Sequence, residues 1–263
     1  MSDLFRLDGK VVAVIGAGSG IGEAVAIGAA RQGASSVACF DVNESAVAAV
    51  AGGIRDTGVA TSHGALDIAD ERAVESALGA CVDTHGRLDA VVCTPAINVR
   101  KPILKYSGEE FDRVVRVNLR GNFNVLQSAG RILTRQKSGS IVLVSSIRSL
   151  VTEPGQSVYS MSKAGIVQLV RTAATEWAVD GVRVNALGPG VVETPLTAQI
   201  KNDAAWYDAY AKKNPMQRWA QPSEMVGPTL FLLSDAASYV TGTILFADGG
   251  WLAADGRFTP PGM

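Results

Sequence analysis

The chain has 263 residues, of which 47% are hydrophobic, and its formal net charge is −1 with a pI of about 6.1. This charge lacks the basic excess of nucleic-acid-binding proteins and of proteins that bind anionic membranes. The length and the apolar content suit one large α/β domain with a full core. We therefore expect a single domain over residues 1–263, with neither a nucleic acid nor a membrane as partner.

The cysteines and histidines form no pattern that indicates a disulfide framework or a metal site. Cys39, Cys81 and Cys93 are odd in number and far apart, which favours reduced thiols and a cytoplasmic location. His63 and His85 lack the spacing of a ligand pair, so we expect no metal. Residues 1–10 lack the apolar segment of a secretory signal, and no run approaches the length of a membrane span.

The first motif is an apolar run that leads into alternating glycines. Val11–Ile15 reads as a buried strand, and the Ala-rich residues 23–32 that follow the glycines read as a helix. Glycine lets the backbone turn sharply and approach a pyrophosphate, which the helix N-terminus attracts. The motif predicts a dinucleotide site, and a glycine-rich turn without a ligand is the alternative. The predicted cofactor-binding residues of this loop are Gly16, Gly18, Ser19, Gly20, Ile21 and Gly22.

An acidic residue ends the next predicted strand. Asp41 directly follows the apolar run 37–40 and lies nineteen residues after Gly22. A carboxylate there can accept hydrogen bonds from a ribose 2′-OH and repels a 2′-phosphate. Asp41 therefore predicts NAD rather than NADP as cofactor, while a helix cap or a turn residue is the alternative.

Apolar runs alternate with helical patterns along the whole chain. Asn43 and Asp70 are predicted N-caps, and Ser107 with Glu110 forms a capping box for one long helix that ends at about Thr134. The alternation predicts an α/β fold: one doubly wound (Rossmann) domain of about seven parallel strands with helices on both faces. A helical excursion over residues 191–216 is expected to cover the substrate, and 252–263 form an irregular tail. The predicted strands are 11–15, 37–40, 60–66, 88–93, 140–145, 183–187 and 244–247, and the other helices are 44–57, 71–84, 157–178 and 223–233.

Three polar residues around the fifth predicted strand form a candidate catalytic set. Ser146 directly follows that strand, and Tyr159 and Lys163 lie four residues apart on one face of the following helix. Tyrosine is a poor base at neutral pH, because its pKa is near 10, and a nearby ammonium favours the phenolate. The set predicts that Tyr159 exchanges a proton with an alcohol or ketone oxygen, that Ser146 donates to that oxygen, and that hydride moves to or from a nicotinamide. A solvated helix pair is the alternative.

Several motifs together make the chain similar to one known family. It resembles the short-chain dehydrogenases/reductases from Leu7 to Trp251. The motifs that carry the resemblance are GAGSGIG (Gly16 to Gly22), LD (Leu66-Asp67), VNLRG (Val117 to Gly121), SIVLVSS (Ser140 to Ser146), YSMSK (Tyr159 to Lys163), VRVNALGPGVVETP (Val182 to Pro195) and ADGG (Ala247 to Gly250).

The resemblance implies further roles. Asn118 resembles the family's fourth catalytic residue, which kinks its helix and holds a water linked to the lysine. Asp67 resembles the acid beside the adenine, and Lys163 the lysine that binds the nicotinamide ribose. The chain departs from the family at Ile15, usually Thr, and at CTPA (93–96) in place of NNAG. The further cofactor-binding residues that we predict are Ile68, Thr94, Ala96, Tyr159, Pro189, Gly190, Val192 and Thr194, the last over the nicotinamide.

The substrate is less firmly specified. Arg100, Arg148 and Trp206 fall in segments that should border the cleft, where the two guanidiniums could clamp a carboxylate or phosphate; surface or interface arginines are the alternative. Similarity to family members that act on sugar acids favours a small sugar acid or polyol. A 3-oxoacyl thioester reductase is the alternative enzyme, and a catalytically silent NAD(H)-binding sensor or scaffold is the alternative of another class.

We also expect a homotetramer. The long helices 107–134 and 157–178 resemble those that pair across subunits in the family. Their expected outer faces carry Val114, Leu126, Val167 and Val170, which are too apolar for solvent.

Overall fold

The computed structural model describes residues 4–254, which are built around one parallel sheet. The strand order is β3-β2-β1-β4-β5-β6-β7, and every pairing is parallel. The chain winds outward from β1 in one direction and then from β4 in the other. The strands are β1 (Val11–Ile15), β2 (Ser36–Asp41), β3 (Ala60–Ala65), β4 (Ala90–Cys93), β5 (Gly139–Val144), β6 (Val182–Pro189) and β7 (Ile244–Ala247).

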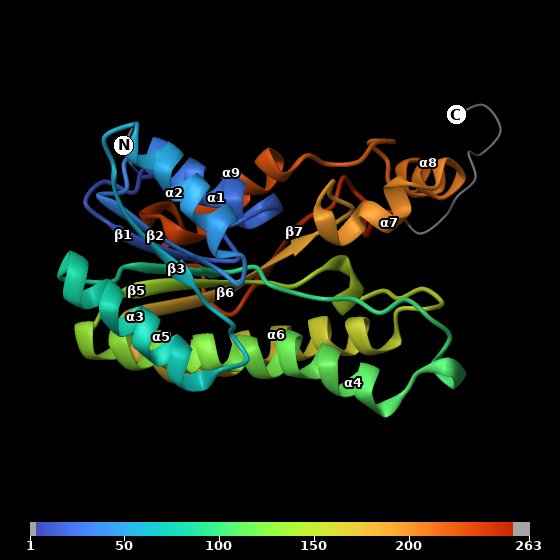
Figure 1. Ribbon diagram of the computed structural model, residues 1–263, viewed down its shortest axis with the longest axis horizontal. Coiled ribbons are helices and arrows are strands. Elements are labelled where there is room, and N and C mark those ends of the chain that lie inside the picture. The colour runs from blue at the N-terminus through green and yellow to red at the C-terminus, as the bar shows by residue number, and fades with distance from the viewer. Residues whose placement is uncertain (1–3, 255–263) are drawn as a thin grey trace.

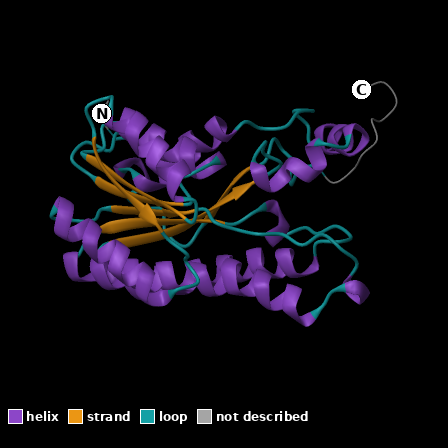
Figure 2. Ribbon diagram, in the orientation of Figure 1, coloured by secondary structure: helices purple, strands orange, loops and turns teal. Residues whose placement is uncertain are grey.

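Helices cover both faces of this sheet, which confirms the predicted doubly wound α/β class (Figure 1). In Figure 2 the orange strands lie between two purple helical layers. One layer holds α1, α2 and α9, the other holds α3, α4, α5 and α6, and the short α7 and α8 lie beyond the end of the sheet. Within residues 4–254, no helix has both the length and the apolarity to cross a membrane. The helices are α1 (Gly20–Arg31), α2 (Glu44–Arg55), α3 (Glu71–His85), α4 (Gly108–Val115), α5 (Asn122–Gln136), α6 (Ser157–Trp177), α7 (Ala198–Lys201), α8 (Ala204–Lys213) and α9 (Val226–Leu233).

The position of β1 in the middle of the sheet explains why this strand is apolar at every residue. Val11, Ala13 and Ile15 pack into the layer of α3, α5 and α6, while Val12 and Val14 pack into the layer of α1, α2 and α9. Successive side chains of a strand point to opposite faces. A strand covered on both faces therefore carries no polar position.

The predicted caps are present, and the predicted helix 107–134 is helical throughout but contains a π-helical turn. Asn43, Asp70 and Ser107 each accept a backbone N–H at the start of their helices, and Ser107 and Glu110 complete the capping box. A π-helical turn, Arg116–Gly121, separates α4 from α5. Such turns insert a residue into the helix and often occur at functional sites.

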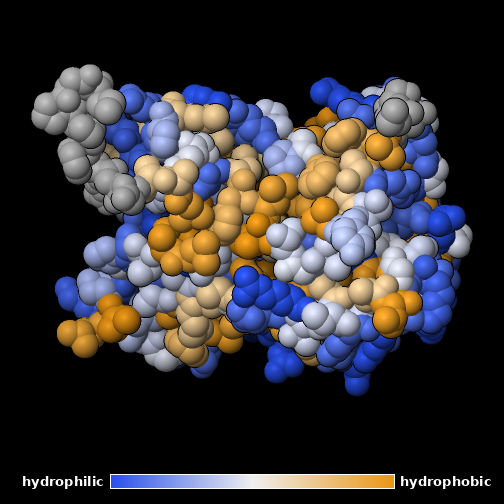
Figure 3. Space-filling model, turned by 180° about the vertical axis from the view of Figure 1, so that it is seen from behind, coloured by the Kyte–Doolittle hydropathy of each residue, from blue (hydrophilic) through white to orange (hydrophobic). Residues whose placement is uncertain are grey.

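The structure corrects the expected apolar faces of these helices. Val114, Leu126, Val167 and Val170 are all buried within the single chain, at most 7% exposed, so they form no outer patch. The exposed apolar residues of α4, α5 and α6 are instead Phe111, Phe123 and Met161. Apolar surface also crosses the middle of the back of the molecule, between more polar layers (Figure 3). The homotetramer stays a prediction, and the predicted tail lies outside the described residues beyond residue 254.

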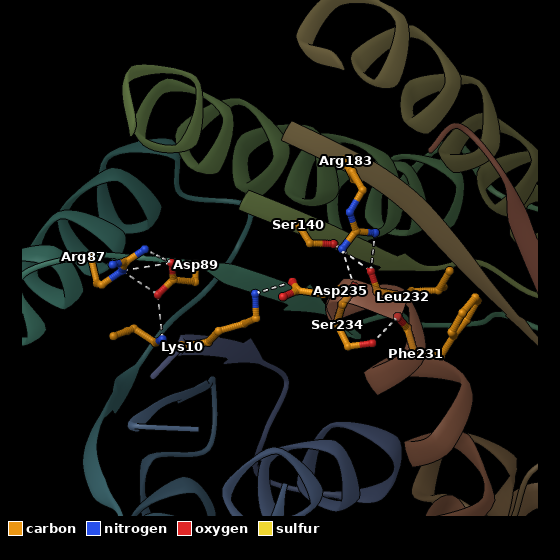
Figure 4. Close-up of polar contacts among 10 residues, drawn as sticks. Lys10, Arg87, Asp89, Ser140, Arg183, Phe231, Leu232, Ser234 and Asp235 are labelled. Carbon is orange, nitrogen blue, oxygen red and sulfur yellow. Dashed lines mark hydrogen bonds and ion pairs between the residues drawn. The ribbon is translucent and has the colours of Figure 1, made fainter. Parts of the chain in front are cut away.

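A polar network closes the edge of the sheet where the strands begin (Figure 4). The Arg183 guanidinium of β6 donates to the carbonyls of Leu232 (2.7 Å) and Ser234 (3.0 Å) at the end of α9. Ser140 of β5 also donates to the Leu232 carbonyl, at 2.9 Å. The last carbonyls of a helix have no partner within it, and a cation there also favours the helix dipole. Arg183 therefore fixes α9 against the sheet.

We expect the substitution Arg183→Met to lower the free energy of unfolding by about 2–3 kcal/mol, because it removes the charged donor that bonds the Leu232 and Ser234 carbonyls at the end of α9. Urea unfolding measures this change. Arg171→Met, on the exposed side of α6, is the control and should stay within about 0.5 kcal/mol of the wild type. An equal effect of both substitutions would contradict the role of Arg183.

Candidate active site

A cavity of about 520 Å³ lies at the carboxyl ends of β1, β2, β4, β5 and β6. Open α/β sheets bind ligands at this edge, where the strand order changes direction. The cavity brings together the predicted residues of the glycine loop, the acids after β2 and β3, and the segments after β4, β5 and β6. The sequence-predicted residues that line it are Gly16, Ser19, Gly20, Ile21, Asp41, Asp67, Ile68, Thr94, Ala96, Ser146, Tyr159, Lys163, Pro189, Gly190, Val192 and Thr194.

The glycine loop is shaped to admit a phosphate. Gly16 and Gly20 have positive φ angles of 85° and 57°, and a side chain on Gly22 would overlap the carbonyl oxygen of Gly16. The first N–H groups of α1 have no partner within the helix, and the Ser19 side chain does not cap them. Gly18 and Gly22 do not line the cavity, so they shape the loop from behind.

Thr94 supplies a tie across the CTPA segment. Its hydroxyl donates to the carbonyls of Ile15 (3.1 Å) and Gly16 (3.3 Å), which joins the end of β4 to the end of β1. This bond holds the glycine turn although Ile15 lacks the hydroxyl usual at its position. The loop and its support thus fit a dinucleotide phosphate.

Asp41 both shapes the loop and faces the cavity. One carboxylate oxygen accepts the N–H of Gly18 at 3.0 Å, and the other accepts the N–H of Asn43 at 2.9 Å. A side chain on Gly18 would lie 2.9 Å from the Asp41 carboxyl carbon, so this position requires glycine. Asp41 therefore acts as a turn residue, one of the alternatives, while it still presents negative charge to the cavity.

Tyr159 and Ser146 meet at the inner end of the cavity. Tyr159 is 9% exposed and its phenol is hydrogen-bonded to Ser146. Burial raises the pKa of Tyr159, whereas the Ser146 hydrogen bond and the charges of Arg100 and Arg148 lower this pKa. Burial is the largest of these effects, so the pKa of Tyr159 is raised overall, and the two arginines oppose the rise. The role of Lys163 in favouring the phenolate stays a prediction.

Lys163 lies deeper than expected. It is 1% exposed, its ammonium donates to the carbonyl of Val144 at 2.8 Å, and Nζ lies 5.6 Å from the centre of the Tyr159 ring. Burial lowers the pKa of Lys163 to about 8, and the nearby Cys93 opposes this shift. The hydrogen bond to β5 explains why the ammonium does not contact the phenol oxygen.

Asn118 lies in the π-helical turn and is fully buried. Its amide accepts the N–H of Ile97 and donates to the Ile97 carbonyl, both at 2.9 Å, and it also donates to Ser162 at 3.0 Å. Ser162 in turn donates to the carbonyl of Tyr159 at 2.7 Å. Asn118 therefore positions the loop after β4 against α6, and its hydrogen bonds do not run toward Lys163.

The predicted substrate residues form a cluster around an acid that the sequence interpretation missed. Glu153 accepts hydrogen bonds from Arg148 (2.7 Å) and Arg100 (3.5 Å). Arg100 also stacks on Trp206, with its guanidinium carbon 5.5 Å from the ring centre. The side chain of Arg100 is 13% exposed and that of Arg148 is 6% exposed. Both arginines are therefore largely buried and paired, and they are not surface groups.

Other members of this cluster were also missed. Asn98, Gln156 and Tyr210 join Arg100, Arg148, Ser146 and Tyr159 around a small cavity next to the main one. The available signal was the acid Glu153 between Ser146 and Tyr159, which stands in a segment already expected to border the cleft. Tyr210 lies on α8, within the excursion 191–216 that was expected to cover the substrate, but it was not singled out as a site residue. Within residues 4–254, no group of three or more potential ligands could hold a metal.

Comparisons with known proteins agree with this geometry. Residues 16–252 match the family described as "Enoyl-(Acyl carrier protein) reductase". The gluconate 5-dehydrogenase of Gluconobacter oxydans is 32% identical over 248 residues, which are 94% of this chain and 96% of the relative. The 3-oxoacyl-[acyl-carrier-protein] reductase of Thermotoga maritima is 34% identical over 93% of this chain and 98% of its own.

A solved structure is also similar. The gluconate 5-dehydrogenase from Burkholderia cenocepacia J2315, in complex with NADP and tartrate, superimposes with a TM-score of 0.92 at 34% identity, over 96% of this chain and 98% of that chain. The chain belongs to the short-chain dehydrogenase/reductase family and is an oxidoreductase with a nicotinamide dinucleotide, NAD(P), as cofactor.

The buried Lys163 predicts a pH-dependent stability. Because its pKa falls from 10.5 to about 8 in the folded chain, the unfolded chain binds more protons between these values, and the free energy of unfolding rises with pH there. The expected gain from about pH 7 to about pH 9.5 is about 2 kcal/mol. The buried Cys39, Cys81 and Cys93, whose pKa values are raised by burial, act in the opposite direction above about pH 9 in both proteins. Urea unfolding should therefore show the rise as a gain of the wild type relative to Lys163→Met. Equal pH slopes in the two proteins would contradict the assignment.

Proposed function

We propose that the protein is an NAD-dependent dehydrogenase that interconverts a secondary alcohol and a ketone on a small hydroxylated acid, such as a sugar acid. The observation that carries the proposal is that Ser146, Tyr159 and Lys163 line the same cavity as the glycine loop. A proton-transfer group and a dinucleotide site in one cavity suit hydride transfer.

The chain's residues supply the proton chemistry. In the oxidative direction, the Tyr159 phenolate takes the proton of the substrate hydroxyl, and in reduction it returns that proton to the ketone oxygen. Ser146 donates a hydrogen bond to the same oxygen and stabilises its developing charge. Lys163 would bind the nicotinamide ribose, and its buried ammonium adds positive charge near the Tyr159 ring. A nicotinamide held in this cavity would supply the hydride chemistry.

The preference for NAD rests on Asp41. Its carboxylate faces the cavity at the end of β2, where the resemblance expects the adenosine ribose. A 2′-phosphate there would meet a negative charge at short range, which costs several kcal/mol. Because Asp41 also holds the Gly18 N–H, it cannot turn away without opening the loop.

The substrate class rests on the arginines. Arg100 and Arg148 line the small cavity together with Tyr159, so a carboxylate bound there lies close to the reacting carbon. The gluconate 5-dehydrogenase relatives support a sugar acid, and the D-threitol dehydrogenase of Mycolicibacterium smegmatis, 36% identical, supports a polyol. A 3-oxoacyl thioester is the second candidate, favoured by the relative from Thermotoga maritima.

We expect Tyr159→Phe to lower kcat by about 10²–10⁴-fold, because the proton-transfer group is lost. The rate of NADH formation from NAD across sugar acids, polyols and 3-hydroxyacyl thioesters measures this. NADH affinity, followed by fluorescence titration, is the control and should change little. A wild type that binds NADH but turns over no compound of the panel would favour the sensor or scaffold instead.

Asp41→Asn should raise kcat/KM with NADP relative to NAD by about tenfold or more, since it removes the repelling charge. Its amide oxygen can still accept one of the two backbone N–H groups that Asp41 holds, so the cofactor ratio is the readout rather than the absolute affinity. Asp67→Asn is the matched control, because Asp67 also lines the cavity but is predicted to lie beside the adenine. An unchanged cofactor ratio in Asp41→Asn, or an equal change in both variants, would contradict the assignment.

A further inference from the structure

Glu153 has no role in the proton or hydride transfer described above, yet it is the most highly connected side chain beside the substrate cavity. Its carboxylate accepts hydrogen bonds from Arg148, Arg100, Tyr210 and Gln156, the last at 2.5 Å. It does not itself line the small cavity, whereas all four donors do. Glu153 thus acts on a ligand through these neighbours.

The first consequence concerns charge. Two guanidiniums and one carboxylate leave the cluster with one net positive charge. Arg148 is also covered by Trp251, whose ring centre lies 5.4 Å from the guanidinium carbon. Because water is largely excluded from Arg148, at 6% exposure, the charge is weakly screened. A ligand with one carboxylate would balance it.

The second consequence concerns hydrogen-bond direction. A carboxylate only accepts, so Gln156 must turn its NH₂ toward Glu153 and its oxygen toward Asn98. Asn98 then donates its NH₂ to Gln156 at 2.9 Å. This leaves Asn98 Oδ1 buried, with no partner in the described part of the chain, at a residue that lines the cavity. A buried acceptor without a partner is costly, and a substrate hydroxyl would satisfy it.

We propose that Glu153 determines the specificity of this site: it neutralises one of two arginines so that the cavity selects a substrate with a single carboxylate, and through Gln156 it sets Asn98 to accept a substrate hydroxyl. The proposal deepens the proposed function and rests on it, since it takes the reacting alcohol to lie at Tyr159. The proposal predicts that the site binds a hydroxylated monocarboxylate more tightly than a neutral polyol or a dicarboxylate.

The test uses three ligands with the same hydroxylated chain and different charge: glucitol (neutral), gluconate (one carboxylate) and glucarate (two carboxylates). Their dissociation constants are measured by calorimetry on the full chain saturated with NADH, so that no turnover occurs. In the wild type we expect gluconate to bind most tightly. Glu153→Gln should shift the affinity ratio of glucarate to gluconate upward by about tenfold, because the cluster then carries two positive charges.

A second variant keeps the test independent of the folding of the first. Arg100→Gln removes the net charge of the cluster, so the preference for gluconate over glucitol should fall by about tenfold. The double variant, with Glu153→Gln and Arg100→Gln, restores one positive charge and should regain the wild-type order. Glu109→Gln, on the exposed side of α4, removes the same charge away from the cluster and should leave all ratios unchanged.

The outcomes separate the two proposals. If the wild type binds the ligands but the ratios do not move in Glu153→Gln or Arg100→Gln, the role of Glu153 is overturned and the proposed function stands. A common weakening of all three ligands in Glu153→Gln is expected, because all three carry the hydroxyl that Asn98 accepts, so the charge role is judged by the affinity ratios. If the double variant does not return these ratios to the wild-type order, that role is overturned. If the wild type binds none of the three, the substrate class and the role of Glu153 both fail.

Discussion

The reversal of winding between β1 and β4 is the constraint on which the site depends. Both strands are fully buried and paired to each other, so their ends are fixed, but the chain leaves β1 toward one half of the sheet and β4 toward the other. The crevice between these exits needs no side chain to open it. What the chain must supply is a tie that keeps the two ends in register, and the bonds from Thr94 to Ile15 and Gly16 do this.

The features that were predictable from sequence are those set by short-range rules. Because β1 is buried on both faces, the strand Val11–Ile15 could be predicted with its correct bounds. The capping residues allowed the starts of α2, α3 and α4 to be predicted. Helical spacing alone did not predict the π-helical turn, and only the resemblance placed a kink at Asn118, because the hydrogen bonds of Asn118 in this turn are made to Ile97, a residue on a distant loop.

The same limit explains why the surroundings of other residues could not be predicted. Val114 and Val170 fit either a buried or an intersubunit face, because helical spacing shows that a stripe is apolar and not what covers it. Tyr159 and Lys163 share a helix face, but their chemistry depends on what surrounds them. Lys163 is held by Val144, while the cations that lower the Tyr159 pKa come from two other loops. The spacing of Tyr159 and Lys163 along their helix predicts neither the hydrogen bond of Lys163 to β5 nor the arginines beside Tyr159.

The main cavity carries negative charge at one end, and the small cavity beside it carries positive charge. This difference in charge favours different ligands at the two ends of the site. Asp41 lies at the end of β2, whereas Arg100 and Arg148 follow β4 and β5 beside Tyr159. An anionic substrate is repelled at the first end and attracted at the second, while a cofactor with free ribose hydroxyls gains hydrogen bonds at the first. Under the proposed function, the glycine loop takes the pyrophosphate. A dinucleotide and an anionic substrate would then be sorted to opposite ends of the site before any chemistry begins.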